Sequence, residues 1–222
     1  MAIYGRAGTL KSWLSLEQAF ALATGQMWLA YPCIESRVLI MQAEVTESNY
    51  IERLIAYSRN VNGLMPDNIW MDNDLTMDLS GTEGMNLLEN DIEEVSPDVI
   101  IIDCLYKIVS GSVSNEIDLK KVIANVDRIR QAYGTAFVFI HHPRKDQSSE
   151  KEDHIDKGFE EMLTSSIFGD WLETIIKVTS VPPNQDQPDT IRLDFQKLKN
   201  ARQFVSPIQV RFNRDRAQFT LS

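Results

Sequence analysis

Near its start the chain reads Gly5-Arg6-Ala7-Gly8-Thr9-Leu10-Lys11-Ser12, between an apolar run at 2–4 and an alanine-rich segment at 12–24. We interpret these segments as a strand, a glycine-containing turn and a helix that ends at Gly25. In a phosphate-binding loop, successive backbone N–H groups face phosphate oxygens, a lysine bridges the terminal phosphates, and a hydroxyl binds Mg2+. The helix N-terminus adds a field that favours anions. The residues predicted to contact a nucleotide are Gly5, Arg6, Ala7, Gly8, Thr9, Leu10, Lys11, Ser12 and Trp13.

Leu10 stands where the usual pattern of such a loop has its last glycine. Its side chain either crowds the phosphates, or points away and leaves the backbone path unchanged. Taken alone, the octapeptide is also compatible with a glycine-bearing turn before an ordinary helix. The order of strand, turn and helix favours the nucleotide-binding interpretation.

Apolar runs alternate with helical patterns through most of the chain. Further strands are predicted over 38–43, 69–71, 99–102 and 136–140, and helices over 46–59, 85–95 and 115–133. A polar segment, 143–165, is predicted to be a mobile loop, and short β segments follow over 174–179, 190–195, 208–212 and 218–221. This pattern predicts a single α/β domain over 1–222: a mostly parallel twisted sheet with helices on both faces and an antiparallel C-terminal extension over 174–222.

Composition excludes several classes of protein. The 222 residues include 22 Lys plus Arg and 32 Asp plus Glu, a formal charge of -10, which excludes a globally basic nucleic-acid wrapper but not local basic loops. No apolar run approaches the roughly 20 residues that span a bilayer. The two cysteines, Cys33 and Cys104, match no metal or redox spacing, so we expect a reducing, cytoplasmic setting.

Two acidic residues follow predicted strands. Asp103 ends the run 99–102, where open parallel sheets bind ligands, and with Ser12 it can hold Mg2+. An aspartate that caps the next turn is the alternative. Glu44 follows the strand 38–43 and can polarise a water that attacks the terminal phosphate. Gln42 and Glu47 are the neighbouring candidates if the strand register differs.

Two histidines, His141 and His142, end the strand 136–140. A lone histidine at this place is more often structural. A pair beside the other predicted site residues can sense the terminal phosphate and report its loss to the following loop. Because His154 is the only other histidine, the sequence does not indicate a zinc site.

The motifs together resemble those of the RecA-like P-loop ATPases, most closely the RepA-type replicative helicases of plasmids and phages. The resemblance rests on GRAGTLKSWLSLEQAFALATG, VLIMQAE, PDVIIIDCL, TAFVFIHHPRK and LDFQKLKNAR. It implies that Lys11 and Ser12 bind phosphate and Mg2+, and that Asp103 is the second Mg2+ residue. It also implies that Glu44 is the general base or positions the water, and that His142 is the phosphate sensor. The chain begins almost on the phosphate-binding loop, as expected for a fragment or a reduced protein.

The resemblance also implies assembly. RecA-like motors assemble head to tail, in a hexameric ring or a filament, and a pair of cations from one subunit reaches the nucleotide of the next. Lys197 and Lys199 resemble that pair, with Arg202 close by; two exposed residues of an edge strand are the alternative. Arg144 and Lys145 are the expected contacts to single-stranded DNA, although acidic residues are interleaved through 143–165.

The predicted function is Mg2+-dependent ATP hydrolysis at subunit interfaces by the motor of a single-stranded DNA translocase or replicative helicase. A different class is a nucleotide-switched scaffold, or a recombination or regulatory ATPase that does not unwind DNA. A third is an inactive relic that binds nucleotide poorly.

Overall fold

The computed structural model describes residues 1–59, 65–73, 77–109, 115–142, 166–182 and 189–222. None of the helices in these ranges is long and apolar enough to cross a membrane. The main sheet has nine strands in the order β11-β10-β9-β8-β1-β7-β6-β4-β5. Its strands are β1 (Ala2–Tyr4), β4 (Val38–Gln42), β5 (Ile69–Asp72), β6 (Val99–Asp103), β7 (Ala136–His141), β8 (Thr174–Ser180), β9 (Thr190–Leu198), β10 (Ile208–Asn213) and β11 (Gln218–Leu221).

All neighbouring strands from β8 to β5 in this order are parallel, whereas β9, β10 and β11 add to the β8 edge as antiparallel strands. The prediction of a mostly parallel sheet with an antiparallel C-terminal extension is therefore confirmed. The extension starts one strand later than predicted, because β8 pairs with β1 in parallel.

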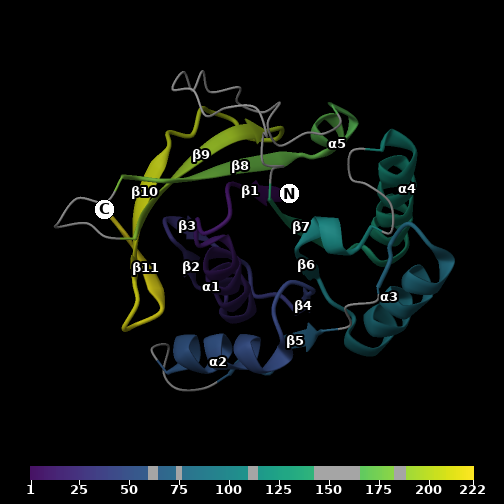
Figure 1. Ribbon diagram of the computed structural model, residues 1–222, viewed down its shortest axis with the longest axis horizontal. Coiled ribbons are helices and arrows are strands. Elements are labelled where there is room, and N and C mark those ends of the chain that lie inside the picture. Colours follow the sequence, from purple (N-terminus) through teal and green to yellow (C-terminus); the bar gives the residue numbers. More distant parts are fainter. Residues whose placement is uncertain (60–64, 74–76, 110–114, 143–165, 183–188) are drawn as a thin grey trace.

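Helices cover both faces of the sheet (Figure 1). They are α1 (Lys11–Thr24), α2 (Glu47–Ser58), α3 (Thr82–Val95), α4 (Glu116–Tyr133) and α5 (Ser166–Trp171), with a short 3-10 helix, η1 (Leu105–Lys107). One core lies between the sheet and α3, α4 and α5, and the other between the sheet and α1 and α2.

The strand β6 shows why its sequence is continuously apolar. Successive side chains of a strand point to opposite faces. Ile100 and Ile102 are buried in the core beneath α3 and α4, and Ile101 is buried in the core beneath α1. Because both faces of the sheet are covered by helices, side chains on either face of β6 must be apolar until Asp103 ends the strand.

Several elements differ from the prediction. A two-stranded hairpin, β2 (Met27–Trp28) and β3 (Tyr31–Pro32), and the short helix α5 were not predicted, because such short segments carry no periodic pattern. The helix α3 begins at Thr82 and not at residue 85. The predicted helix excludes Gly84, but this residue lies within α3, where a Cβ would lie 2.1 Å from the backbone oxygen of Asp78, so the close approach requires glycine. The predicted loop 143–165 lies outside the described residues.

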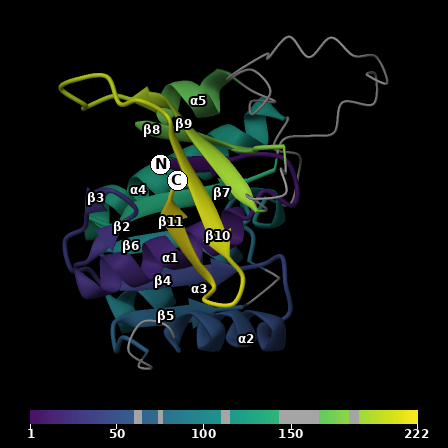
Figure 2. The same cartoon turned by 90° about the vertical axis from the view of Figure 1, so that its left-hand side faces the viewer.

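The antiparallel strands pack across α1, and Figure 2 shows β10 and β11 in front of this helix. Glu17 of α1 is buried, and its carboxylate Oε2 accepts a hydrogen bond of 2.8 Å from the backbone N–H of Phe219 in β11. Burial raises the pKa of Glu17 to about 7, and the hydrogen bond opposes this shift. One buried carboxyl therefore joins the first helix to the last strand.

We predict that Glu17→Gln changes how stability depends on pH. Between about 4.5 and 7 the folded chain keeps a proton on Glu17 that the unfolded chain releases, so the free energy of unfolding falls as pH rises through this window. Glutamine keeps an oxygen acceptor for Phe219 and does not titrate. The variant should lose this fall and be the more stable protein at pH 8, by on the order of 3 kcal/mol. Denaturant unfolding at pH 5 and pH 8 measures it, and equal slopes in both proteins would contradict it.

Candidate functional site

The parallel register brings the ends of four strands together at one rim of the sheet. Tyr4 of β1 is paired with His141 of β7, and Asp103 of β6 is paired with Gln42 of β4. Since β6 and β7 are themselves neighbours, the segments that follow all four strands start side by side. The predicted loop 5–12, His142, Asp103 and Glu44 therefore occupy a common edge, where parallel α/β sheets bind ligands.

The loop after β1 is held tightly at its first residue. A Cβ on Gly5 would lie 2.2 Å from the backbone oxygen of Val178 in β8, so this position excludes other residues. The Gly5 N–H donates to the backbone oxygen of His141 at 3.3 Å. Gly8 has a φ of 81°, in the left-handed region that favours glycine. The two predicted glycines therefore have different roles, close approach at Gly5 and backbone conformation at Gly8.

Leu10 has the backbone conformation that a glycine would supply. Its φ is 60° and its ψ is 18°, in the left-handed region, and it directly precedes the helix α1. Its half-buried side chain packs against the core beneath α1 and α2. Of the two alternatives for this residue, the packing supports the one in which the side chain points away and the backbone path is preserved.

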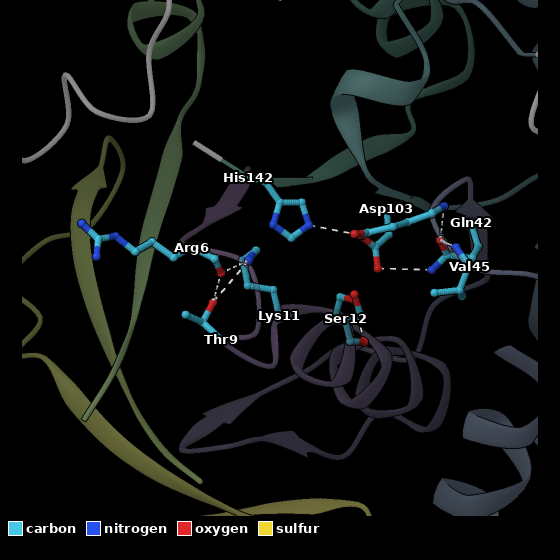
Figure 3. A network of polar contacts seen from close by, with 10 residues as sticks. Arg6, Thr9, Lys11, Ser12, Gln42, Val45, Asp103 and His142 are labelled. Atoms are coloured by element: carbon cyan, nitrogen blue, oxygen red, sulfur yellow. Dashed lines mark hydrogen bonds and ion pairs between the residues drawn. The ribbon is translucent and has the colours of Figure 1, made fainter. Parts of the chain in front are cut away.

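Lys11 folds back onto its own loop (Figure 3). Its Nζ donates to the backbone oxygen of Arg6 at 2.8 Å and to Thr9 Oγ1 at 3.2 Å. Burial lowers the pKa of Lys11 to about 8, against the opposing effect of the carboxylates of Asp103 and Glu44. A phosphate group would offer this buried ammonium a stronger, charged acceptor than a carbonyl and a hydroxyl.

Asp103 is buried at the end of β6 and has two polar neighbours. Gln42 Nε2 donates to Oδ2 at 3.2 Å, and the Ser12 side chain lies close enough to lower the pKa of the carboxyl group. Burial, as the largest effect, raises the pKa of Asp103. Its Oδ1 is buried and has no hydrogen-bond partner among the residues that the structure describes. A buried carboxylate oxygen without a donor, next to a serine hydroxyl, fits a hard cation such as Mg2+.

Gln42 holds the turn that carries Glu44. Its Oε1 accepts from the backbone N–H of Glu44 at 2.6 Å and of Val45 at 3.3 Å, while its amide nitrogen donates to Asp103. One buried amide thus links the backbone under Glu44 to the carboxylate of Asp103. The sequence suggested Gln42 only as a substitute for Glu44, yet a polar residue inside an apolar strand was the available signal.

Glu44 and His142 face each other across the rim. His142 Nε2 donates to Glu44 Oε2 at 3.1 Å, which leaves Nδ1 buried and without a hydrogen bond within the described ranges. His141 is buried, and its contact with the loop is made by its backbone oxygen. His142, rather than His141, is therefore the histidine whose side chain reaches the predicted catalytic carboxylate.

Cys104 and Tyr106 belong to the same cluster and were missed by sequence reasoning. Cys104 is buried directly after Asp103. Its thiol lies beside the Tyr106 side chain, whose ring is edge-on to the His142 ring at 6.5 Å. Burial raises the pKa of the Cys104 thiol. One ligand atom each from Glu44, Cys104 and His142 lies within 4.8 Å of the others. The sequence spacing of these residues, 44, 104 and 142, carries no metal-binding pattern.

The remaining predicted residues lie elsewhere or outside the description. Trp13 packs against Phe212 of β10, with ring centroids 5.1 Å apart and the rings inclined at 42°, so its side chain contacts the sheet extension. Lys197 lies within β9, which continues to Leu198, and Lys199 follows the strand. Arg144 and Lys145 are not among the described residues.

Comparisons with known proteins give a family for this chain and solved structures that share its fold. Residues 1–148 match the family model described as an AAA domain (AAA_25). A solved structure of an ATPase domain superposes with a TM-score of 0.73 at 11% identity, covering 99% of this chain and 83% of that one. The flagellar accessory protein FlaH from Methanocaldococcus jannaschii gives a TM-score of 0.66 at 12% identity, covering 100% of this chain and 88% of that one. These two matches confirm the predicted RecA-like fold. A search of curated protein sequences finds no significant match.

The conformation of Leu10 predicts an order of stability for two variants. Both Leu10→Gly and Leu10→Ala remove the same packing against the core, but only glycine adopts a φ of 60° without steric cost. Leu10→Gly should therefore be more stable than Leu10→Ala by about 1 kcal/mol, as measured by denaturant unfolding. The opposite order would show that this residue does not hold a left-handed conformation.

Proposed function

Since the chain belongs to the AAA domain family and its domain is a RecA-like P-loop ATPase, we propose that it hydrolyses ATP with Mg2+ at the rim formed by β1, β7, β6 and β4. The observation that carries the proposal is the convergence of Lys11, Ser12, Glu44, Asp103 and His142 at this rim. A lysine, a hydroxyl paired with a carboxylate, and a second carboxylate held by a histidine are the groups that phosphoryl transfer to water requires.

Binding starts from a loop whose lysine is already occupied. The phosphates replace the Arg6 carbonyl and the Thr9 hydroxyl as acceptors for Lys11 Nζ, and the N-terminus of α1 favours their negative charge. Ser12 and Asp103 would hold Mg2+, which supplies charge compensation for the phosphates. The negative phosphates favour the charged form of Lys11 and so offset the effect of burial on its pKa.

Glu44 acts on the attacking water. Its carboxylate accepts a hydrogen bond from the water and takes its proton as the water oxygen bonds to the terminal phosphorus, while the bond from that phosphorus to the ADP oxygen breaks. His142 donates to Glu44 and fixes the orientation of the carboxylate, and Gln42 fixes the backbone beneath it. Loss of the terminal phosphate frees the Glu44–His142 pair to rearrange and so signals the nucleotide state.

Two substitutions test the site against a matched control. Glu44→Gln keeps the size of the side chain but removes the base, so we expect turnover to fall on the order of 10²–10⁴-fold with nucleotide binding retained. Lys11→Ala should lose binding as well. Glu47→Gln, at an exposed position in the first turn of α2, should leave both unchanged. Phosphate release and binding of a fluorescent ATP analogue are the measurements, and full activity in both site variants would refute the site.

The two lysines at the end of β9 differ in their contacts. Lys197 Nζ donates to the backbone oxygens of Gly169 at 2.8 Å and Asp170 at 3.0 Å, within its own chain. Lys199 is exposed, and its ammonium makes no hydrogen bond or ion pair to the described part of the chain. We therefore assign the cation delivered to a neighbouring subunit to Lys199, and to Lys197 the fixing of α5 against β9. Cations supplied in this way contribute on the order of 10³–10⁵ in rate in GTPases.

Mixing two inactive proteins tests this assignment. An interface that pairs the site of a Lys199→Ala subunit with the lysine of a Glu44→Gln subunit is intact, so a mixture should recover part of the activity that neither protein has alone. Lys199→Ala mixed with Lys11→Ala should recover activity in the same way. Absence of recovery in assemblies proven to exchange subunits would exclude a contribution of Lys199 in trans. The assay also requires a head-to-tail homo-oligomer, a ring or a filament.

A replicative motor on single-stranded DNA is the first form of this function that we propose, with Arg144 and Lys145 facing the strand. The motifs that resemble those of RepA-type helicases, and the fold shared with the solved ATPase domain, support it.

The second form is a nucleotide-switched scaffold, favoured by the equally complete match to a flagellar accessory protein and by the net charge of -10. ATP turnover stimulated by single-stranded DNA, in a salt-dependent manner, selects the motor. Assembly that depends on ATP and Mg2+ without DNA stimulation selects the scaffold. In either form of the function, we propose that the protein acts in the cytoplasm.

A further inference from the structure

Three chemically different side chains meet at the rim from three separate segments. Glu44 follows β4, Cys104 follows β6 and His142 follows β7, and one ligand atom of each lies within 4.8 Å of the others. The Glu44 Oε2 to His142 Nε2 distance is 3.1 Å. Two ligands of a tetrahedral zinc ion, with bonds of about 2.0–2.1 Å, are separated by about 3.3 Å, so this pair is already at a ligand spacing.

The chemistry of the three groups differs from that of the Mg2+ site. Mg2+ takes oxygen ligands and keeps several waters, which suits Ser12 and Asp103. A thiolate, an imidazole and a carboxylate are the ligands of Zn2+, and three protein ligands with one open position are a common zinc arrangement. The cluster therefore discriminates against Mg2+ although the two sites share a rim.

The surroundings of the cluster suit a bound ion. The thiol of Cys104 is buried, whereas Glu44 is exposed and His142 is half-buried, so the ion can enter from the solvent side. The Tyr106 side chain lies beside Cys104, and its ring is edge-on to that of His142 with the centroids 6.5 Å apart. Partners of this kind orient metal ligands and strengthen binding.

We propose that Glu44, Cys104 and His142 form a binding site for Zn2+ that inhibits the ATPase. The ion replaces the thiol proton of Cys104, which passes to the solvent. It also replaces the hydrogen bond between His142 and Glu44: the proton on His142 Nε2 passes to the solvent while Nδ1 takes one up, so the imidazole binds the ion in its neutral Nδ1–H form. Zn2+ binding by the three residues is inferred from the geometry of the cluster and does not depend on the proposed function. Inhibition rests on the proposed function, because the ion occupies the carboxylate that would take the proton of the attacking water.

The experiment uses Co2+ as a spectroscopic probe on the nucleotide-free full chain. Wild type should show a thiolate-to-Co2+ charge-transfer band in the near ultraviolet, and Zn2+ should abolish it while excess Mg2+ should not. Cys104→Ser should lose the band, whereas Cys33→Ser, which removes the only other thiol, should keep it. His142→Ala should weaken Zn2+ binding at least about tenfold, measured by competition with a chromogenic chelator.

The outcomes separate this proposal from the proposed function. A missing band in wild type, or a band that survives in Cys104→Ser, overturns the metal site. If circular dichroism shows that Cys104→Ser does not fold, the His142→Ala variant tests the metal site instead, because His142 lies near the solvent side. Unchanged Zn2+ affinity in His142→Ala also overturns the site.

Zn2+ should stop ATP turnover in wild type, and a chelator that prefers zinc over magnesium should restore it. Turnover that continues with the band present overturns inhibition, and a chain that binds Co2+ through the cluster but never hydrolyses ATP refutes the proposed function alone.

Discussion

In-register parallel pairing of β1, β7, β6 and β4 is the constraint on which the site depends. Each of these strands contributes a single short segment to the rim, and no two of the segments are close in sequence. A shift of one residue in any pair would reverse which side chains face the two cores, because alternate residues of these strands are buried on opposite faces. The packing of Ile100, Ile101 and Ile102 therefore also fixes where Asp103 stands.

The same rim concentrates charge in a place with little water. Lys11 and Asp103 are both buried. Burial lowers the pKa of Lys11 and raises that of Asp103, and both shifts favour the neutral form of the group. Each charge is nevertheless placed where its partner favours it, and neutral groups complete the arrangement: the Arg6 carbonyl for Lys11, and Ser12 with Gln42 for Asp103. A buried ammonium that meets only neutral acceptors, and a buried carboxylate that meets only neutral donors, have surroundings that a phosphate and a divalent cation can improve.

The C-terminal strands connect the site to the rest of the molecule. Glu17 ties β11 to α1, the helix that begins at Lys11, and Lys197 ties the end of β9 to α5. Lys199 is exposed and directly follows the end of β9, and this strand end is anchored on its own chain. For the proposed action of Lys199 on a neighbouring copy, a fixed strand end is better suited than a free loop, because less conformational freedom is lost on contact.

The sequence by itself determined the parallel sheet, the loop after β1 and the residues at the ends of the strands, because apolar runs and glycine spacing report local structure. It did not determine the conformation of Leu10, the role of Gln42 or the different contacts of Lys197 and Lys199. These depend on neighbours distant in the chain: the core beneath α1, the carboxylate of Asp103 and the backbone of α5. The grouping of Cys104 with Glu44 and His142 was likewise decided only by tertiary structure, since strand order places side by side what the chain keeps apart.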